Sequence, residues 1–285
     1  MTIITHTDAD GIISAYLVQK VFGYSKVYFE NQATLPKALS SLAKKNEKKV
    51  FILDISPSKE SLEKILPFQE VTWIDHHQIQ NVTPPKNTKL IIKQYPSTAS
   101  IISEEFKIES KLVKIAEEID TNNVKSEDAE KLRDYIDYIK NTARGIVFKP
   151  MAKQLIKKLD NLNFLSIPQI ALSIAAHKVK EINKFDSLSI DERNTKLGRV
   201  LFVEIKQHIP TFEILKKYNS DYVIIFRKMK KGTKIEFRTG TKKNVLSLAE
   251  LLKGGGHLNA AGAFTKNRNI SNIKKKIVNF IKKRM

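Results

Sequence analysis

The sequence of 285 residues contains no cysteine, which excludes disulfide bonds, zinc ribbons, iron–sulfur clusters and thiol nucleophiles. Any bound metal must therefore be held by carboxylate oxygens and imidazole nitrogens. No apolar run approaches the roughly 18 residues that a transmembrane helix needs. The opening MTIITHTDAD also lacks the basic start and the long apolar stretch of a signal peptide. We therefore expect a cytoplasmic protein without a membrane partner.

Acidic residues are scarce relative to basic ones, because 50 Lys and Arg face 30 Asp and Glu, for a formal net charge of +20. The excess is concentrated toward the C-terminus. Residues 265–285 hold eight basic residues and no acidic one, and residues 225–243 hold eight basic residues and Glu236 alone. Such clustering is typical of a surface that binds a polyanion. A lysine-rich solubility strategy would also explain the total charge.

Short apolar runs alternate with helical patterns through the first half of the chain, which predicts an α/β domain with a parallel sheet and helices on both faces. The predicted strands are residues 2–5, 27–29, 50–53, 71–74 and 90–92. The predicted helices are residues 12–21, 35–44, 58–66 and 98–106, with Ser56 and Pro57 as a helix start. From residue 111 to residue 185 the pattern is wholly helical.

The polar, weakly periodic residues 186–199 are interpreted as a linker between a catalytic domain, 1–185, and a substrate-binding domain, 200–285. The second domain is predicted to be a smaller α+β domain. Its expected strands are residues 200–205, 222–226 and 234–238, and its expected helices are residues 245–253 and 271–283.

Carboxylates and imidazoles follow three of the predicted strands. They are His6, Asp8 and Asp10 after the first strand, Asp54 after the strand 50–53, and Asp75, His76 and His77 after the strand 71–74. Parallel strands present such residues at one edge of a sheet. Clustered carboxylates repel one another unless a cation lies between them.

The donors are too many for one ion, so we expect two divalent cations, with Mn²⁺ preferred and Mg²⁺ possible. Two ions roughly 3.5–4 Å apart can activate water and neutralise charge on a phosphoryl group.

Each aspartate also has a structural explanation, since a single Asp after a strand is more often a helix cap than a ligand. The histidines argue against that explanation for the whole group, because three of the six in the chain lie in these segments. His177 and His208 lack acidic neighbours of this type and are interpreted as structural or surface residues.

These motifs resemble the signature motifs of the DHH phosphoesterase superfamily. The resemblance is carried by HTDADG at 6–11, the aspartate of FILD at 54, DHH at 75–77 and STAS at 97–100. GGGHLNAAG at 254–262 is similar to the glycine-rich motif of the DHH-associated C-terminal domain. The order and the spacing both fit, and the motifs reach both ends of the chain.

The resemblance implies that His6, Asp8 and Asp54 hold one ion and that Asp10, Asp54 and His76 hold the other, with Asp54 bridging. It also implies a further aspartate from a later helix. Asp120, in AEEIDTNN, is the best match, although Glu117, Glu118 and Asp128 lie close by.

The remaining implied roles concern catalysis and the substrate. Asp75 would orient a neighbouring imidazole, and His77 would face the substrate phosphate. In the second domain, Arg238 would bind a phosphate with its guanidinium fork, together with His257 and the glycine loop of Gly254, Gly255 and Gly256. The glycine loop has a structural alternative, since glycines also end a helix without binding a ligand. The alternative for Arg238 is a solvated strand residue.

The resemblance implies a phosphodiesterase that hydrolyses single-stranded RNA or DNA, or short oligonucleotides, as a RecJ-like exonuclease or an oligoribonuclease does. A small-nucleotide phosphodiesterase or phosphatase is an alternative, acting on a cyclic dinucleotide or 3′-phosphoadenosine phosphate. Pyrophosphatases of the superfamily lack the GGGH motif. A structural partner of a replication or repair complex is an alternative of another class, which the intact motifs argue against. The polarity of digestion, the choice between RNA and DNA, and the oligomeric state are not predicted.

Overall fold

The computed structural model describes residues 1–77, 82–142, 146–183, 185, 188–206, 211–240 and 244–284. The chain divides into two compact units, Met1–Ile174 and Ala175–Met285. Within the described residues, no helix is both long and apolar enough to cross a bilayer. His208 lies outside the described residues.

The first unit is built on a five-stranded parallel sheet with the strand order β2-β1-β3-β4-β5. Its strands are β1 (Thr2–Thr5), β2 (Lys26–Phe29), β3 (Lys49–Leu53), β4 (Glu70–Asp75) and β5 (Thr88–Ile92). All five predicted strands are thus confirmed, with ends that differ by at most two residues. Apolar side chains cover both faces of β1, β3 and β4, as expected for a parallel sheet with a helical layer on each side.

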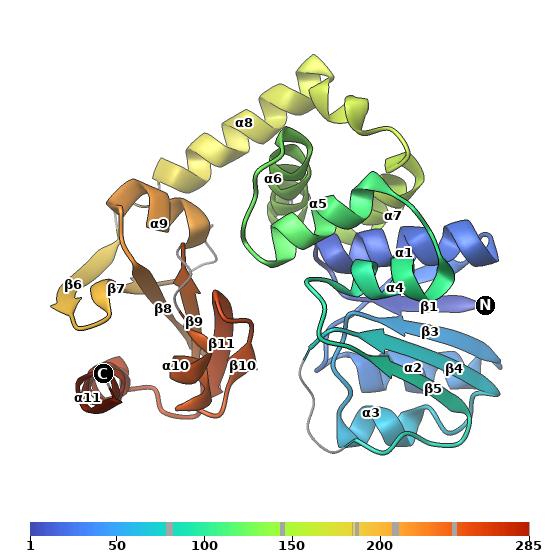
Figure 1. Ribbon diagram of the computed structural model, residues 1–285, viewed down its shortest axis with the longest axis horizontal. Coiled ribbons are helices and arrows are strands. Elements are labelled where there is room, and N and C mark those ends of the chain that lie inside the picture. The colour runs from blue at the N-terminus through green and yellow to red at the C-terminus, as the bar shows by residue number, and fades with distance from the viewer. Residues whose placement is uncertain are drawn as a thin grey trace. The chain divides into compact units, whose positions relative to one another are not determined.

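Helices cover the two faces of this sheet (Figure 1). One face packs against α1 (Ala9–Phe22) and α4 (Thr98–Phe106), and α5 (Lys111–Asp120) packs on these two helices. The other face packs against α2 (Leu35–Lys44) and α3 (Lys59–Lys64). The prediction that Ser56 and Pro57 start a helix is wrong. Ser58 is the N-cap of α3, because its side chain accepts a hydrogen bond from the Ser61 amide at 3.2 Å.

From residue 111 to residue 183 the described elements are all helices, as predicted for residues 111–185. After α5 come α6 (Glu127–Asn141), α7 (Phe148–Lys158), the short 3₁₀ helix η2 (Leu162–Ser166) and α8 (Pro168–Asn183). The apolar sides of α5, α6 and α7 share one core with α1. That core fixes the C-terminal end of α5, where Asp120 lies.

The second unit contains a six-stranded mixed sheet with the order β10-β11-β9-β8-β7-β6. Its elements are β6 (Ser189–Thr195), β7 (Gly198–Ile205), α9 (Thr211–Tyr218), β8 (Tyr222–Met229), β9 (Gly232–Thr239), α10 (Leu246–Glu250), β10 (Gly255–Gly256), β11 (Ala260–Thr265) and α11 (Ile270–Arg284). One face of the sheet packs against α10 and α11, and the other packs against α9 and Phe185. An α/β domain with a parallel sheet followed by a smaller α+β domain is therefore confirmed as the fold class.

The prediction that residues 186–199 form a linker is wrong for most of that stretch. Ser189–Thr195 is the edge strand β6, which pairs antiparallel with β7 from Ser189 opposite Glu204 to Thr195 opposite Gly198. Its side chains are mostly polar because an edge strand needs no apolar outer face. Polarity alone therefore does not distinguish such a strand from a linker.

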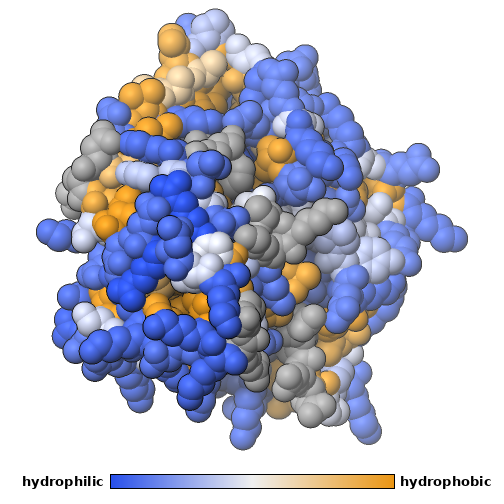
Figure 2. All heavy atoms as spheres, turned by 60° about the vertical axis from the view of Figure 1, so that its left-hand side comes forward, coloured by the Kyte–Doolittle hydropathy of each residue, from blue (hydrophilic) through white to orange (hydrophobic). Residues whose placement is uncertain are grey.

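Hydrophilic side chains cover most of the molecular face shown in Figure 2, and the apolar ones gather in small, separate patches. No lysine or arginine is buried among the described residues, so the excess positive charge lies in contact with solvent, where it acts over distance.

Candidate metal centre

The three strands that precede the predicted ligands are neighbours in the sheet. In the paired strands, Thr5 of β1 lies opposite Leu53 of β3, and Leu53 lies opposite Ile74 of β4. The residues that directly follow these strand ends therefore meet at one edge of the sheet. Parallel strands bring ligands together at this edge.

The first group of possible metal ligands consists of His6, Asp8 and Asp54, and their ligand atoms lie within 4.8 Å of one another. The Nδ1 atom of His6 is hydrogen-bonded to Oδ2 of Asp8 and lies 3.7 Å from Oδ2 of Asp54. Asp8 is also the N-cap of α1, because its Oδ1 accepts a hydrogen bond from the Gly11 amide at 3.0 Å. The second oxygen of Asp8 remains on the side of the cluster, so the capping role and the ligand role are compatible.

The second group consists of Asp10, Asp54 and His76, again with ligand atoms within 4.8 Å of one another. The Nε2 atom of His76 lies 3.7 Å from Oδ2 of Asp10 and 3.5 Å from Oδ1 of Asp54. Asp54 is thus common to both groups, as a bridging ligand would be.

The orientation of His76 is set by a backbone carbonyl. Nδ1 of His76 lies 3.1 Å from the Tyr95 carbonyl oxygen, which can only accept, so Nδ1 carries the proton. The Nε2 atom is then left with its lone pair and is directed at the carboxylates. A histidine whose second nitrogen is fixed by a carbonyl is a usual arrangement for a metal ligand.

Asp54 has the most constrained position in the cluster. Its backbone has a φ of 57°, which is the left-handed region, and the residue is buried. Its Oδ1 accepts a hydrogen bond from the Thr98 hydroxyl at 3.3 Å, whereas its buried Oδ2 has no hydrogen-bond partner among the described residues. A buried carboxylate oxygen without a donor is unfavourable by itself. The donor set therefore fits divalent cations.

The fourth-motif aspartate is distinguished from its neighbours by its contacts. Oδ2 of Asp120, at the end of α5, lies 3.5 Å from Nε2 of His76. Glu118 instead accepts hydrogen bonds from the backbone amides of residues 125 and 126, at 2.9 and 2.7 Å. Glu117 accepts one from Ser100 at 3.0 Å, and Asp128 pairs with Lys111 at 3.4 Å. Of these four acids, the structure brings Asp120 to the cluster.

The pKa shifts of the four carboxylates differ in direction. Burial, reinforced by the charges of Asp8 and Asp10, raises the pKa of Asp54 well above its usual range. Burial also raises the pKa of Asp10 and, strongly, that of Asp120. For Asp8 the opposing effect of burial is outweighed by the His6 charge and hydrogen bond, which hold the pKa well below its usual range. A cation at this site would displace the retained protons.

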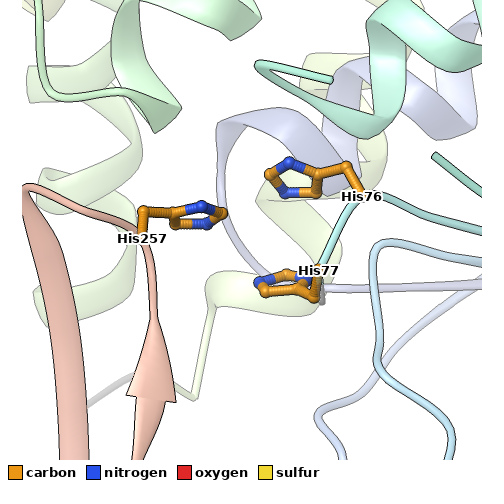
Figure 3. A group of neighbouring side chains, drawn as sticks. All are labelled: His76, His77 and His257. Carbon is orange, nitrogen blue, oxygen red and sulfur yellow. The ribbon is translucent and has the colours of Figure 1, made fainter. Parts of the chain in front are cut away.

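His77 lies beside this cluster, with its ring centroid 4.6 Å from that of His76 (Figure 3). Nδ1 of His77 lies 2.7 Å from Oδ1 of the fully buried Asp75. Burial opposes the charged imidazole, but the hydrogen bond and the negative charge of Asp75 raise the pKa of His77 to about 9. Asp75 thus contacts a neighbouring imidazole, as its predicted orienting role requires.

Replacing Asp75 with asparagine is expected to lower the pKa of His77 in the metal-free protein. The substitution removes the negative charge that stabilises the imidazolium of His77, while burial still disfavours the charged ring. His77 should therefore lose its proton at a pH at least one unit lower than in the wild type. The measurement is a titration of the histidine ring signals by NMR in the presence of a chelator. An unchanged His77 titration would show that Asp75 does not hold the ring in its charged form.

In the second unit the structure places Arg238 beside the glycine motif. Arg238 of β9 lies opposite Ala260 of β11, and its Nη1 donates hydrogen bonds to the carbonyls of Phe237 at 3.0 Å and Ala261 at 3.1 Å. Its Nη2 lies 3.6 Å from Glu236. The guanidinium is held in place by these contacts.

The three glycines of the motif differ in their surroundings. A Cβ at Gly254 would lie 2.1 Å from the Gly262 carbonyl oxygen, and one at Gly256, which has a φ of 135°, would lie 2.7 Å from that of Ala260. A Cβ at Gly255 would meet no atom within 4 Å. Gly254 and Gly256 are therefore explained by close backbone packing, and the open space lies over Gly255. His257 follows in the turn between β10 and β11 (Figure 3). Its amide donates a hydrogen bond to the Ala260 carbonyl at 2.9 Å.

Some contacts that hold the ligands in place were not identified from the sequence. The backbone amides of Thr98 and Ala99, at the start of α4, donate to the two oxygens of Asp10 at 2.6 and 2.9 Å. The STAS motif therefore holds both Asp10 and Asp54 in place. The Tyr95 carbonyl that orients His76 has no sequence signal, because any residue supplies a carbonyl.

Comparison with known proteins agrees with this arrangement. Residues 1–130 match the DHH family, N-terminal domain, and residues 207–283 match the DHHA1 domain. No curated protein sequence matches the chain significantly. The chain thus belongs to the DHH phosphoesterase superfamily, and its class is that of a metal-dependent phosphoesterase.

Solved structures share this fold. The pGpG-specific phosphodiesterase PggH from Vibrio cholerae is 13% identical, with a TM-score of 0.61 over 99% of this chain and 98% of that one. An exonuclease RecJ bound to manganese is 15% identical, with a TM-score of 0.53 over 99% and 90% of the two chains. RecJ from Thermus thermophilus in complex with Mn²⁺ is 14% identical, with a TM-score of 0.58 over 99% of this chain and 52% of that one. At these identities the likeness shows the fold.

Proposed function

We propose that this protein hydrolyses phosphodiester bonds in single-stranded nucleic acid or short oligonucleotides, with two divalent cations held by the strand-end cluster. The observation that carries the proposal is the position of Asp54. It is shared by both ligand groups, and it keeps a buried carboxylate oxygen without a hydrogen bond in the described part of the chain.

In the proposed arrangement, His6, Asp8 and Asp54 hold one cation, and Asp10, Asp54 and His76 hold the other, with Asp120 close to His76. When bound, two such cations supply a nucleophile from water and offset the charge that develops on the phosphoryl oxygens. Imidazole and carboxylate together favour manganese over magnesium, which prefers an all-oxygen shell.

His77 and Asp75 would act on the substrate rather than on a cation. The Nδ1–H of His77 donates to Asp75, so Nε2 can carry a second proton and donate it in a hydrogen bond to a phosphate oxygen. Asp75 keeps the ring in this orientation and stabilises its charge.

The second unit would bind the phosphate backbone. Arg238 and His257 supply positive or hydrogen-bonding groups, and the open space at Gly255 admits an anion close to the backbone. The exposed lysines of this unit attract a polyanion without regard to sequence, which favours a strand over a single nucleotide.

A short linear dinucleotide is the second candidate substrate. It is favoured by the likeness to a pGpG-specific phosphodiesterase, which extends over nearly the whole length of both chains. Short and long substrates share the same chemistry at the cations, so they differ only in what the second unit contacts.

The test is a digestion time course on end-labelled RNA and DNA strands and on a linear dinucleotide, with Mn²⁺ or Mg²⁺ and with a chelator. We expect cleavage that requires a divalent cation and that is faster with Mn²⁺. Cleavage of the dinucleotide alone would favour the second candidate. No cleavage of any of these substrates with either cation would overturn the proposal and favour a structural role in a replication or repair complex.

A further inference from the structure

One face of the second sheet is only partly covered. The core beneath α10 and α11 takes Ile235 and Phe237 of β9 and Ala261 and Ala263 of β11. Because side chains alternate along a strand, Lys234, Glu236 and Arg238 point to the opposite face, as does Phe264. Phe264 is 52% exposed there, although it is a large apolar residue within a paired strand.

Phe264 belongs to a row that crosses three neighbouring strands. In the pairing of β8, β9 and β11, Arg227 lies opposite Lys234, and Lys234 lies opposite Phe264. Paired strands lie about 4.8 Å apart, so the row spans on the order of 10 Å. Two cations and an aromatic ring thus stand side by side on one face.

The positive charges in this row are only partly balanced by acidic groups among the described residues. Glu236 pairs with Lys234 at 2.9 Å and also lies 3.6 Å from Arg238, so one acid serves two cations. Arg227 has no ion pair among the described residues, and its buried Nε has no hydrogen-bond partner there. Like charges directly opposite one another in a sheet are unfavourable, and a bound anion would remove that cost.

The ring of Phe264 lies over a glycine. A Cβ at Gly232 would lie 2.8 Å from Cζ of Phe264 and 2.1 Å from the Thr265 carbonyl oxygen. Gly232 is not required here by a positive φ, so its role is to leave room for the ring and the neighbouring strand. One side of the ring therefore rests on β9, and much of the rest is open to solvent.

A packing role explains part of this arrangement, because an aromatic residue next to a glycine on a neighbouring strand shields the backbone. It does not explain the two cations in the same row. An exposed ring beside unbalanced positive charges is the combination that binds single-stranded nucleic acid, through base stacking and phosphate attraction.

We propose that Arg227, Lys234 and Phe264 form a secondary binding site for single-stranded nucleic acid, in which a base stacks on Phe264 and the cations contact the flanking phosphates. The inference rests on the proposed function and adds a substrate-length preference to it. Lys234 and Arg238 are four residues apart on β9, or about 13 Å along the strand. A dinucleotide whose phosphate is held at Arg238 has too few phosphates to contact both Arg227 and Lys234 around a base stacked on Phe264, whereas a longer strand has enough.

The experiment compares Phe264→Leu with Phe264→Trp in the full-length protein, because leucine keeps apolar cover over Gly232 and tryptophan keeps a ring for stacking. Binding of a labelled oligonucleotide about eight nucleotides long is measured by fluorescence anisotropy in a chelator, where no cleavage occurs. We expect roughly tenfold weaker binding for the leucine variant and wild-type binding for the tryptophan variant. Arg227→Gln should reduce the slope of log K against log salt by about 0.7.

Turnover separates this inference from the proposed function. The leucine variant should cleave the dinucleotide at the wild-type rate and the longer strand about tenfold less efficiently at low substrate concentration. Equal binding and turnover by the leucine variant, the tryptophan variant and the wild type would overturn the site while leaving the proposed function intact. Equal losses in both variants on the longer strand would show that Phe264 acts only through packing, and would also overturn it. A wild type that binds the oligonucleotide through this row but cleaves nothing would overturn the proposed function alone.

Discussion

The Asp54→Asn variant is expected to lose phosphodiester hydrolysis by about three orders of magnitude or more. Residues that do not touch the metal and only orient one of its ligands already contribute roughly 10–100-fold to the activity of metal sites. Asp54 would contact both cations directly, so its loss should cost more. Asparagine is the informative substitution because it keeps the shape of the side chain and tolerates the φ of 57° that Asp54 adopts. The loss is therefore assigned to the carboxylate charge rather than to backbone strain. The measurement is the initial rate on a labelled strand with Mn²⁺.

The matched control for this variant is Asp128→Asn. Asp128 is an aspartate of the same unit, at the exposed start of α6, where it pairs with Lys111 at 3.4 Å. Its substitution should leave the rate within about twofold of the wild type, since an exposed ion pair contributes little. The metal-free Asp54→Asn protein should also unfold at a higher temperature than the metal-free wild type, because the raised pKa of Asp54 shows that its charge is disfavoured in the fold. Full activity in the Asp54→Asn variant would refute the ligand role of Asp54.

The sequence predicted the strands and helices of the first unit because their signals are local. A run such as VFIL at 50–53 is apolar at every position, which is typical of a strand buried on both faces. The sequence also indicated which residues meet, since the order of parallel strands brings the residues after β1, β3 and β4 to one edge. The division of these residues into two ligand groups came instead from the resemblance of their motifs to the DHH phosphoesterase superfamily.

Features that depend on tertiary contacts could not be predicted in the same way. The left-handed backbone of Asp54 and the carbonyl of Tyr95 that orients His76 carry no residue-type signal. The strand β6 was interpreted as a linker because none of its residues is buried and it is held by pairing with β7 rather than by apolar packing of its own. The exposed Phe264 was not singled out either, because the strand β11 that contains it was not among the predicted strands.

Adding Mn²⁺ to the metal-free wild type is expected to raise the unfolding temperature by roughly 5–10 °C. A ligand that binds only the folded state, at about a hundred times its dissociation constant, stabilises it by about 2.7 kcal/mol, and 1 kcal/mol corresponds to about 2–4 °C in a protein of this size. The physical reason is that the cations neutralise the charges of buried carboxylates that otherwise repel one another at this edge of the sheet. The measurement is a thermal unfolding curve with and without Mn²⁺, and with excess chelator.

The stabilisation by Mn²⁺ should depend on pH, and the direction of this dependence follows from the raised pKa values of the carboxylates. The pKa values of Asp54, Asp10 and Asp120 are raised, so in the metal-free fold these groups retain protons at a pH where free aspartates have lost them. Cation binding must release these protons, so the stabilisation by Mn²⁺ should be larger at pH 8 than at pH 6. Asp54→Asn should abolish most of the shift at both pH values, whereas Asp128→Asn should keep it. Equal shifts in the wild type and in the Asp54→Asn protein would mean that the cations bind elsewhere, and the strand-end cluster would then not be the metal centre.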